Sequence, residues 1–179
     1  SHLTHITIPN SVTHIGHRAF DGCSGLQSVV LPNKLKVIES ATFDGCSNIQ
    51  NLTLPKSLKM VQWYAFNDCD IDHLHYTGDI ASWCDIRFIG SEANPIGASG
   101  NLYINGKSLT NLVIPSSVDS IQAYAFAGLT TLDSITIPKS VKKIGKSDAE
   151  KKMIRYWTKE EFDRYLDSID EKKDAMYHL

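Results

Sequence analysis

The sequence predicts an α/β solenoid in which short parallel strands stack on one another, with one strand in each repeat of 23 residues. Segments that begin at residues 3, 26, 49, 109 and 132 share an apolar run followed by a proline. Five of the six prolines occupy this one position of the repeat, which chance does not explain. Equivalent residues of the first three units are 23 apart: Pro9, Pro32 and Pro55; Phe20, Phe43 and Phe66; Cys23, Cys46 and Cys69.

The apolar run of each unit predicts a strand with one face turned inward. In the second unit, Leu26, Val29 and Leu31 have the spacing of a short strand that packs on one side. Pro32 then ends the strand, because proline has no N–H for another ladder bond. Two further apolar residues point back inward, the phenylalanine fills the far side, and Asp-Gly pairs supply tight turns. Stacked units must cover one another's apolar faces, which predicts a right-handed solenoid with an irregular or short-helical convex side.

An insertion at about residues 76–108 departs from the repeat register. Residues 76–88 are typical of a turn followed by a short helix, for which Asp79 is a suitable N-cap. The Asn105-Gly106 pair lies between two apolar runs and predicts a two-residue hairpin. Insertions in solenoids usually lie on one face and sometimes carry binding, so a binding role stays open here.

Residues 146–179 form a separate, highly charged segment that we place beyond a domain boundary after Gly145. Seventeen of these 34 residues are charged, and the repeat pattern stops in mid-unit. Thr158 and Glu161 form a capping box at the start of a predicted amphipathic helix. We therefore divide the chain into a solenoid over residues 1–145 and a helical tail over residues 146–179.

The repeat resembles a known family. The pattern L-x-x-I-x-I-P-x-x-V-x-x-I-x-x-x-A-F-x-x-C, most complete at residues 3–23 and 109–126, is similar to the BspA-like leucine-rich repeat of bacterial and protist surface proteins. This resemblance covers about residues 3–145. It implies a leucine-rich-repeat fold and an adhesive or protein-binding role at the cell surface or outside the cell, without catalytic residues or cofactors.

The tail resembles a second family. Residues 153–179 contain the run R-Y-W-T-K-E-E-F, which is similar to the start of the catalytic domain of tyrosine recombinases, the phage integrases. The alternative is an ordinary capped amphipathic helix. If the resemblance holds, the chain is a fragment of a fused reading frame, DNA becomes a possible partner, and the catalytic residues lie beyond Leu179.

Composition argues against several other functions. The net charge of −2 gives no excess of Lys and Arg for a nucleic-acid surface, and no window is apolar enough for a membrane span. The first residues do not resemble a signal peptide. There is no glycine-rich phosphate loop and no nucleophile motif in the repeats.

The cysteines and histidines are the candidates for metal or redox chemistry. Equivalent cysteines on neighbouring turns fall near disulfide Cα range, but parallel side-chain vectors favour buried free thiols. His73 and His75 share one strand face, and His14 and His17 form a similar pair. Neither pair has a third ligand at a matching position, so we interpret them as surface histidines and expect no metal site.

The candidate binding residues are the outward-pointing positions of the strands, which form an uncharged stripe of small polar side chains. A protein or glycan ligand suits such a stripe better than a phosphate backbone, although an ordinary solvated strand face is the alternative. By register the stripe comprises His5, Thr7, Ser28, Val30, Asn51, Thr53, His73, His75, Asn111, Val113, Ser134 and Thr136. Four lysines after the strands, Lys34, Lys36, Lys56 and Lys59, are interpreted as solvated turn residues.

The sequence thus predicts a non-catalytic interaction module of a bacterial surface or secreted protein. The alternative is a tyrosine recombinase fragment that carries fused repeats. Because the chain starts inside a repeat, we also expect the edge strand at residues 3–8 to promote end-to-end self-association.

Overall fold

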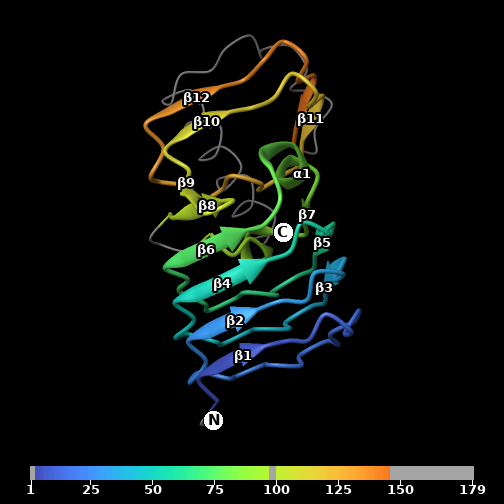
Figure 1. The fold of residues 1–179 in the computed structure, drawn as a ribbon, viewed down its shortest axis with the longest axis vertical. Helices are drawn as coiled ribbons and strands as arrows, with labels where there is room; N and C mark the ends of the chain where they lie inside the picture. The colour runs from blue at the N-terminus through green and yellow to red at the C-terminus, as the bar shows by residue number, and fades with distance from the viewer. Residues whose placement is uncertain (1–2, 97–99, 146–179) are drawn as a thin grey trace, which may run out of the picture.

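The computed structural model describes residues 3–96 and 100–145, which form a β-solenoid of stacked turns (Figure 1). The predictions for residues 146–179 lie outside the described residues. The strands of these turns form four sheets in the described residues: one of six strands, one of three strands, and two parallel pairs beyond the insertion. The predicted parallel solenoid is therefore confirmed, whereas the described residues are a β-solenoid and not the α/β solenoid that we expected.

The first sheet contains the strands predicted for the first three repeat units, followed by strands of the fourth turn and its hairpin. Its order is β1-β2-β4-β6-β8-β9, and every pairing is parallel except the last. The inward residues Val29, Leu52 and Leu74 lie opposite one another in register and are fully buried. The bounds are β1 (His5–Thr7), β2 (Ser28–Val30), β4 (Asn51–Leu54), β6 (His73–Tyr76), β8 (Leu102–Ile104) and β9 (Lys107–Ser108).

The second sheet was not predicted. It forms farther along each turn, where the backbone also pairs with that of the next turn and one residue of each strand is buried. Each of these strands has only two residues, too few for an alternating pattern to be visible in the sequence. The bounds are β3 (Val37–Ile38), β5 (Met60–Val61) and β7 (Arg87–Phe88).

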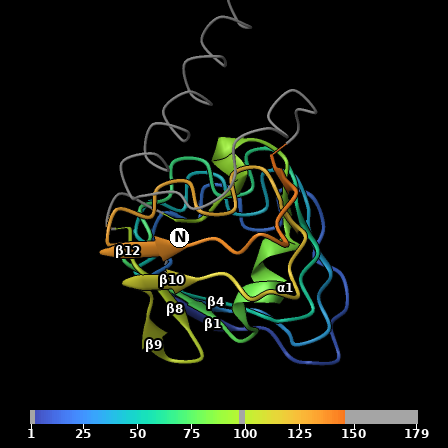
Figure 2. The ribbon, with the colours of Figure 1, turned by 90° about the horizontal axis from the view of Figure 1, so that it is seen from above.

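The last two turns form two separate parallel pairs. β10 (Asn111–Val113) pairs with β12 (Ser134–Thr136), and β11 (Ser120–Ile121) pairs with β13 (Lys143–Ile144). The antiparallel strand β9 occupies the edge of β8, so the first sheet ends there and β10 begins a new sheet. Figure 2 shows β10 and β12 displaced from the column of β1, β4 and β8.

The convex side of each solenoid turn consists of tight β-turns. This agrees with the irregular backbone that the sequence analysis gave as one of two alternatives for the convex side. Two positions of the repeat have positive φ: the residue two before the phenylalanine and the residue two after it. Glycine at the second position, as in Gly22 and Gly45, adopts this conformation without strain. The first position is held by Arg18, Ala41, Tyr64 and Tyr124.

Phenylalanine rings join the first three turns through the core. The ring centroids of Phe20 and Phe43 are 5.2 Å apart, and those of Phe43 and Phe66 are 5.4 Å apart, with nearly parallel planes. Phe43 is fully buried between its two neighbours. One residue type at one repeat position therefore makes the same contact in successive turns.

The insertion forms a fourth turn with additions. The strand β6, which leads into the insertion, pairs with β4, and β7 within it pairs with β5, so the chain passes through both sheets once more. The predicted helix is confirmed as α1 (Ile80–Cys84), which Asp79 and Ser82 begin with a capping box. A 3₁₀ turn, η1 (Ser91–Ala93), follows on the far side. The Asn105-Gly106 hairpin is also confirmed, since both residues have positive φ and connect β8 to β9.

Candidate interaction surface

The structure aligns the twelve predicted stripe residues in rows across the strands. In the first sheet, His5, Ser28, Asn51 and His73 occupy one row, and the residues two further along occupy a second row. All twelve side chains are exposed or half-buried, while the residues between them in most strands are buried. In one row, Ser134 Oγ donates to Asn111 Oδ1 over 2.7 Å.

The stripe is divided in two by the hairpin. Eight of the predicted residues lie on β1, β2, β4 and β6 of the first sheet, and four lie on β10 and β12. The antiparallel strand β9 lies between these parts, beside β8. We use the name strand face for the twelve predicted residues together with Tyr103, which the structure adds on β8.

Tyr103 forms a cluster of three rings with two predicted residues at the centre of the strand face. Its ring centroid lies 4.9 Å from that of His75 and 5.8 Å from that of His73. Sequence reasoning missed Tyr103 because the repeat register is lost in the insertion, although its place before Asn105-Gly106 on a predicted strand was a usable signal. Burial, and secondarily the adjacent His73, lowers the pKa of His75 below its ordinary value. The fold therefore disfavours protonation of His75, and the cluster presents stacked aromatic faces.

The cysteines are free thiols that serve packing. Cys46 and Cys84 are buried, and Cys23 and Cys69 are half-buried. The thiol of Cys46 donates to the carbonyl of Phe20, and that of Cys69 donates to the carbonyl of Phe43, each over 3.0 Å. Desolvation raises the pKa of Cys46, Cys69 and Cys84 to about 12, so these thiols are poor nucleophiles at neutral pH.

The histidine pairs do not assemble a metal centre in the part of the chain that the structure describes. No group of three His, Cys, Asp or Glu side chains converges there. His17 Nδ1 bonds to the carbonyl oxygen of Ser40 over 2.7 Å, which links the first turn to the second. His14 instead lines a groove.

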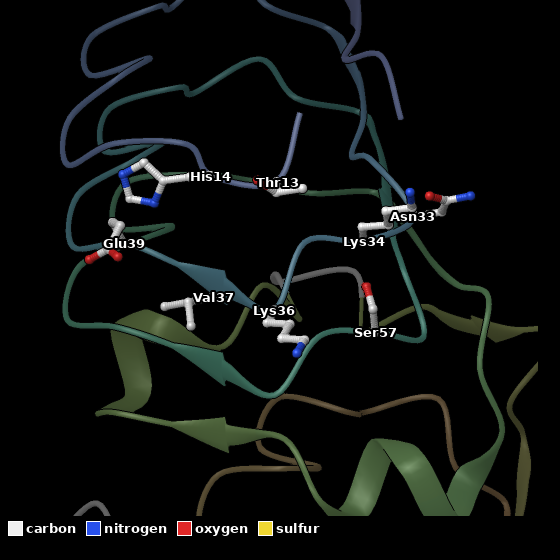
Figure 3. Close-up of a pocket in the computed structure, with 8 residues that line it drawn as sticks. All are labelled: Thr13, His14, Asn33, Lys34, Lys36, Val37, Glu39 and Ser57. Atoms are coloured by element: carbon white, nitrogen blue, oxygen red, sulfur yellow. The ribbon is translucent and has the colours of Figure 1, made fainter. Parts of the chain in front are cut away.

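This groove lies between the first two turns, on the side of the second sheet (Figure 3). Its volume is about 620 Å³, within the range of ligand sites. The lining includes Lys34 and Lys36, which the sequence analysis treated as solvated turn residues only. The other lining residues are Thr13, His14, Asn33, Val37, Glu39 and Ser57.

The sequence matches the model of one protein family. Residues 1–93 and 99–162 match the BspA type leucine-rich repeat region, with six copies of the repeat. The chain belongs to this BspA-type leucine-rich repeat family. Members of the family are repeat proteins suited to interaction, which agrees with a surface of stacked strands and with the resemblance stated from the sequence.

Solved structures of bacterial leucine-rich repeat proteins are similar to this BspA-type chain. A leucine-rich repeat protein from Bacteroides ovatus is 28% identical with a TM-score of 0.53, and the match covers 80% of this chain and 39% of that protein. A leucine-rich repeat protein of T. pallidum is 20% identical with a TM-score of 0.49, over 81% of this chain and 74% of the other. The chain thus spans about two fifths of the Bacteroides protein. No curated protein matches the chain.

Within the described residues, no helix has the length and apolar character to cross a membrane.

Proposed function

We propose that this chain is a non-catalytic binding module of a bacterial surface or secreted leucine-rich repeat protein, and that it recognises a protein or glycan ligand through the strand face. The observation that carries the proposal is the ring cluster of His73, His75 and Tyr103 at the centre of an uncharged, solvent-facing surface. Membership of the BspA-type family and the likeness to a Bacteroides leucine-rich repeat protein support it.

The chemistry of the strand face favours a ligand without strong charge. Thr, Ser and Asn side chains on neighbouring strands offer hydroxyl and amide groups for hydrogen bonds. Stacked rings offer flat apolar surface beside them, an amphipathic combination that is enriched at protein interfaces. Val113, with 60% of its side chain exposed, extends the apolar area on the second part of the face.

The test uses the whole chain, immobilised and screened against a panel of purified extracellular matrix proteins and neutral glycans. A ligand found in this way is then measured against the variant His73→Ala/Tyr103→Ala. We expect about tenfold weaker binding, because ring contacts at an interface centre carry much of the affinity. The control Lys139→Ala changes an exposed residue outside the strand face and leaves affinity unchanged. An equal loss of affinity in both variants, or no loss of affinity in either, contradicts the proposal.

The second candidate is the recombinase fragment, which rests on residues 153–179 and lies outside the described residues. Sequencing single DNA molecules across codons 145–146 and several hundred bases beyond tests it. Molecules that run in frame into a recombinase domain support it. If none spans the junction, only the binding module needs a function.

A further inference from the structure

The first two turns are joined at both ends of the groove but not along it. At one end, the backbone N–H of Asn33 donates to Asn10 Oδ1 over 2.8 Å. At the other end, the N–H of Arg18 donates to the carbonyl of Ser40 over 3.3 Å. Between these points no backbone hydrogen bond joins residues 13–15 to residues 36–39, all of which the structure describes.

The same stretch is closed in the next pair of turns. There, the N–H groups of Lys59 and Met60 donate to the carbonyl of Lys36 over 2.8 and 3.2 Å. The N–H of Gln62 donates to the carbonyl of Ile38 over 3.0 Å. A shift of 23 residues in the sequence predicts equivalent bonds from Val37 to Thr13 and from Glu39 to Ile15, and the structure lacks them. The strand β3 is therefore the open edge of the second sheet.

An open strand edge has a defined binding chemistry. Its N–H and C=O groups pair with any extended backbone that reaches them, and this is how strand addition captures peptides. By the register of the later turns, the N–H groups of Val37 and Glu39 and the carbonyls of Thr13 and Ile15 are the groups that lack these bonds between the first two turns. An extended segment between them would bond to both turns at once.

The charges around the groove select the side chains of such a segment. Lys34 and Lys36 are exposed at the groove, where Glu39 is the single acidic residue of the lining. In the next turn, the stretch between β4 and β5 adds Lys56 and Lys59 and contains no acidic residue. Figure 3 shows Lys34 beside Asn33 near one end of the groove and Lys36 between Val37 and Ser57. The field of these lysines favours an acidic partner.

We propose that this groove binds a short, extended acidic peptide by strand addition between the first and second turns. The site lies apart from the strand face and does not depend on it. The peptide backbone pairs with β3 and with residues 13–15, and its carboxylates face Lys34 and Lys36. Its apolar side chains contact Val37, which lines the groove.

The first experiment maps binding on the unaltered chain. A labelled peptide that alternates glutamate with valine is titrated into ¹⁵N-labelled protein, and amide shifts are followed by NMR. We expect the amides of Val37 and Glu39 to shift, while those of Met60 and Gln62, which are already bonded to the preceding turn, stay in place. A peptide with lysine for glutamate, or one with methylated backbone nitrogens, should bind at least about tenfold more weakly.

Two charge-reversal variants separate this site from general attraction. Lys34→Glu/Lys36→Glu should weaken binding of the acidic peptide by about tenfold or more. The control Lys139→Glu/Lys142→Glu makes the same charge change in the last turn, where the N–H of Lys142 is bonded to the carbonyl of Asp119 over 2.7 Å, and should leave binding nearly unchanged.

Three results overturn the proposal: no binding of the acidic peptide, equal binding of the acidic and basic peptides, or shifts located on the strand face. Equal effects of the two charge reversals also overturn it. If Lys34→Glu/Lys36→Glu does not fold, the neutral variant Lys34→Gln/Lys36→Gln takes its place and should still weaken binding.

Discussion

The first three turns and the insertion are held together by different means. In the first three turns, equivalent phenylalanines stack at 5.2 and 5.4 Å, and equivalent thiols donate to carbonyls of the preceding turn. In the insertion, single residues make contacts that occur once. Trp83 Nε1 donates to the carbonyl of Ala125 over 2.7 Å, and the Asn94 side chain bonds to the same following turn.

The difference between repeated and single contacts shows how a repeat protein accommodates an irregular segment. Where turns repeat, each contact is shared among several equivalent residues, so stability is distributed. Where the register is lost, backbone groups of the next turn lose their equivalent partners and must be bonded by individual side chains. We expect substitutions in the insertion to cost more than substitutions in the repeated contacts.

The largest expected effect is that of Trp83→Ala. Trp83 is fully buried and contacts the rings of Tyr76 and Phe88. Its removal should lower the free energy of unfolding by about 3–5 kcal/mol, as measured by urea denaturation. The matched control Trp63→Ala removes a tryptophan that is 47% exposed and should cost less than about 1 kcal/mol. If the two variants lower the free energy of unfolding by similar amounts, the contacts of Trp83 do not hold the insertion in place as we expect.

A smaller effect is expected for Asn94→Ala. This buried side chain donates to the carbonyls of Tyr124 and Ala127 and accepts from the N–H of Ile96. Loss of these bonds should cost about 1–3 kcal/mol in the same measurement. Asn48→Ala removes an exposed amide that donates to a single carbonyl and should cost under about 0.5 kcal/mol. A cost for Asn94→Ala no larger than that of the control would show that Asn94 is dispensable.

The repeated contacts should be more tolerant. Phe43→Leu keeps an apolar side chain and loses stacking on two sides, for an expected cost of about 1–2 kcal/mol. Phe20→Leu loses one stacking partner at a half-buried position and should cost less. If Phe43→Leu destabilises the chain more than Trp83→Ala does, the phenylalanine stack and not the insertion is the critical contact.

The smallest effect concerns His75, on the strand that leads into the insertion. Its pKa is lowered by burial in the folded chain, so the unfolded chain binds its proton more readily. Stability from this group is therefore present above the ordinary pKa of histidine and is lost as the pH falls below it. Thermal melting between about pH 8 and pH 5 should show a slightly smaller decline for His75→Gln than for the original chain. An unchanged or steeper decline would exclude this contribution.

Local signals made much of the fold predictable. Apolar runs before prolines located β1, β2, β4, β10 and β12, Asp79 located the helix start, and Asn105-Gly106 located the hairpin of β8 and β9. Each of these depends on residues within a few positions of one another. The twelve stripe residues, which are the strand face without Tyr103, followed from the spacing of the strands in the sequence.

The rest depended on contacts that the sequence does not show. The strands of the second sheet have only two residues, so their pairing is visible only once the turns are stacked. The carbonyl that accepts from Trp83 lies 42 residues away, on Ala125, and the groove lies where one set of expected hydrogen bonds is absent. A repeat pattern predicts that all turns are joined alike and cannot show where they are not.

Native-state hydrogen exchange at two equivalent amides tests whether the insertion joins the turns on either side of it into one solenoid. In that case the N–H of Gln122, which is bonded to the carbonyl of Cys84 over 3.0 Å, is as well protected as its equivalent in the regular turns. Gln62 makes the corresponding bond to Ile38, also over 3.0 Å, in the regular turns. We predict opening free energies for these two amides that agree within about 1 kcal/mol. If Gln122 exchanges through an opening that is several kcal/mol easier, the last two turns form a separate unit and the insertion does not join them to the turns before it.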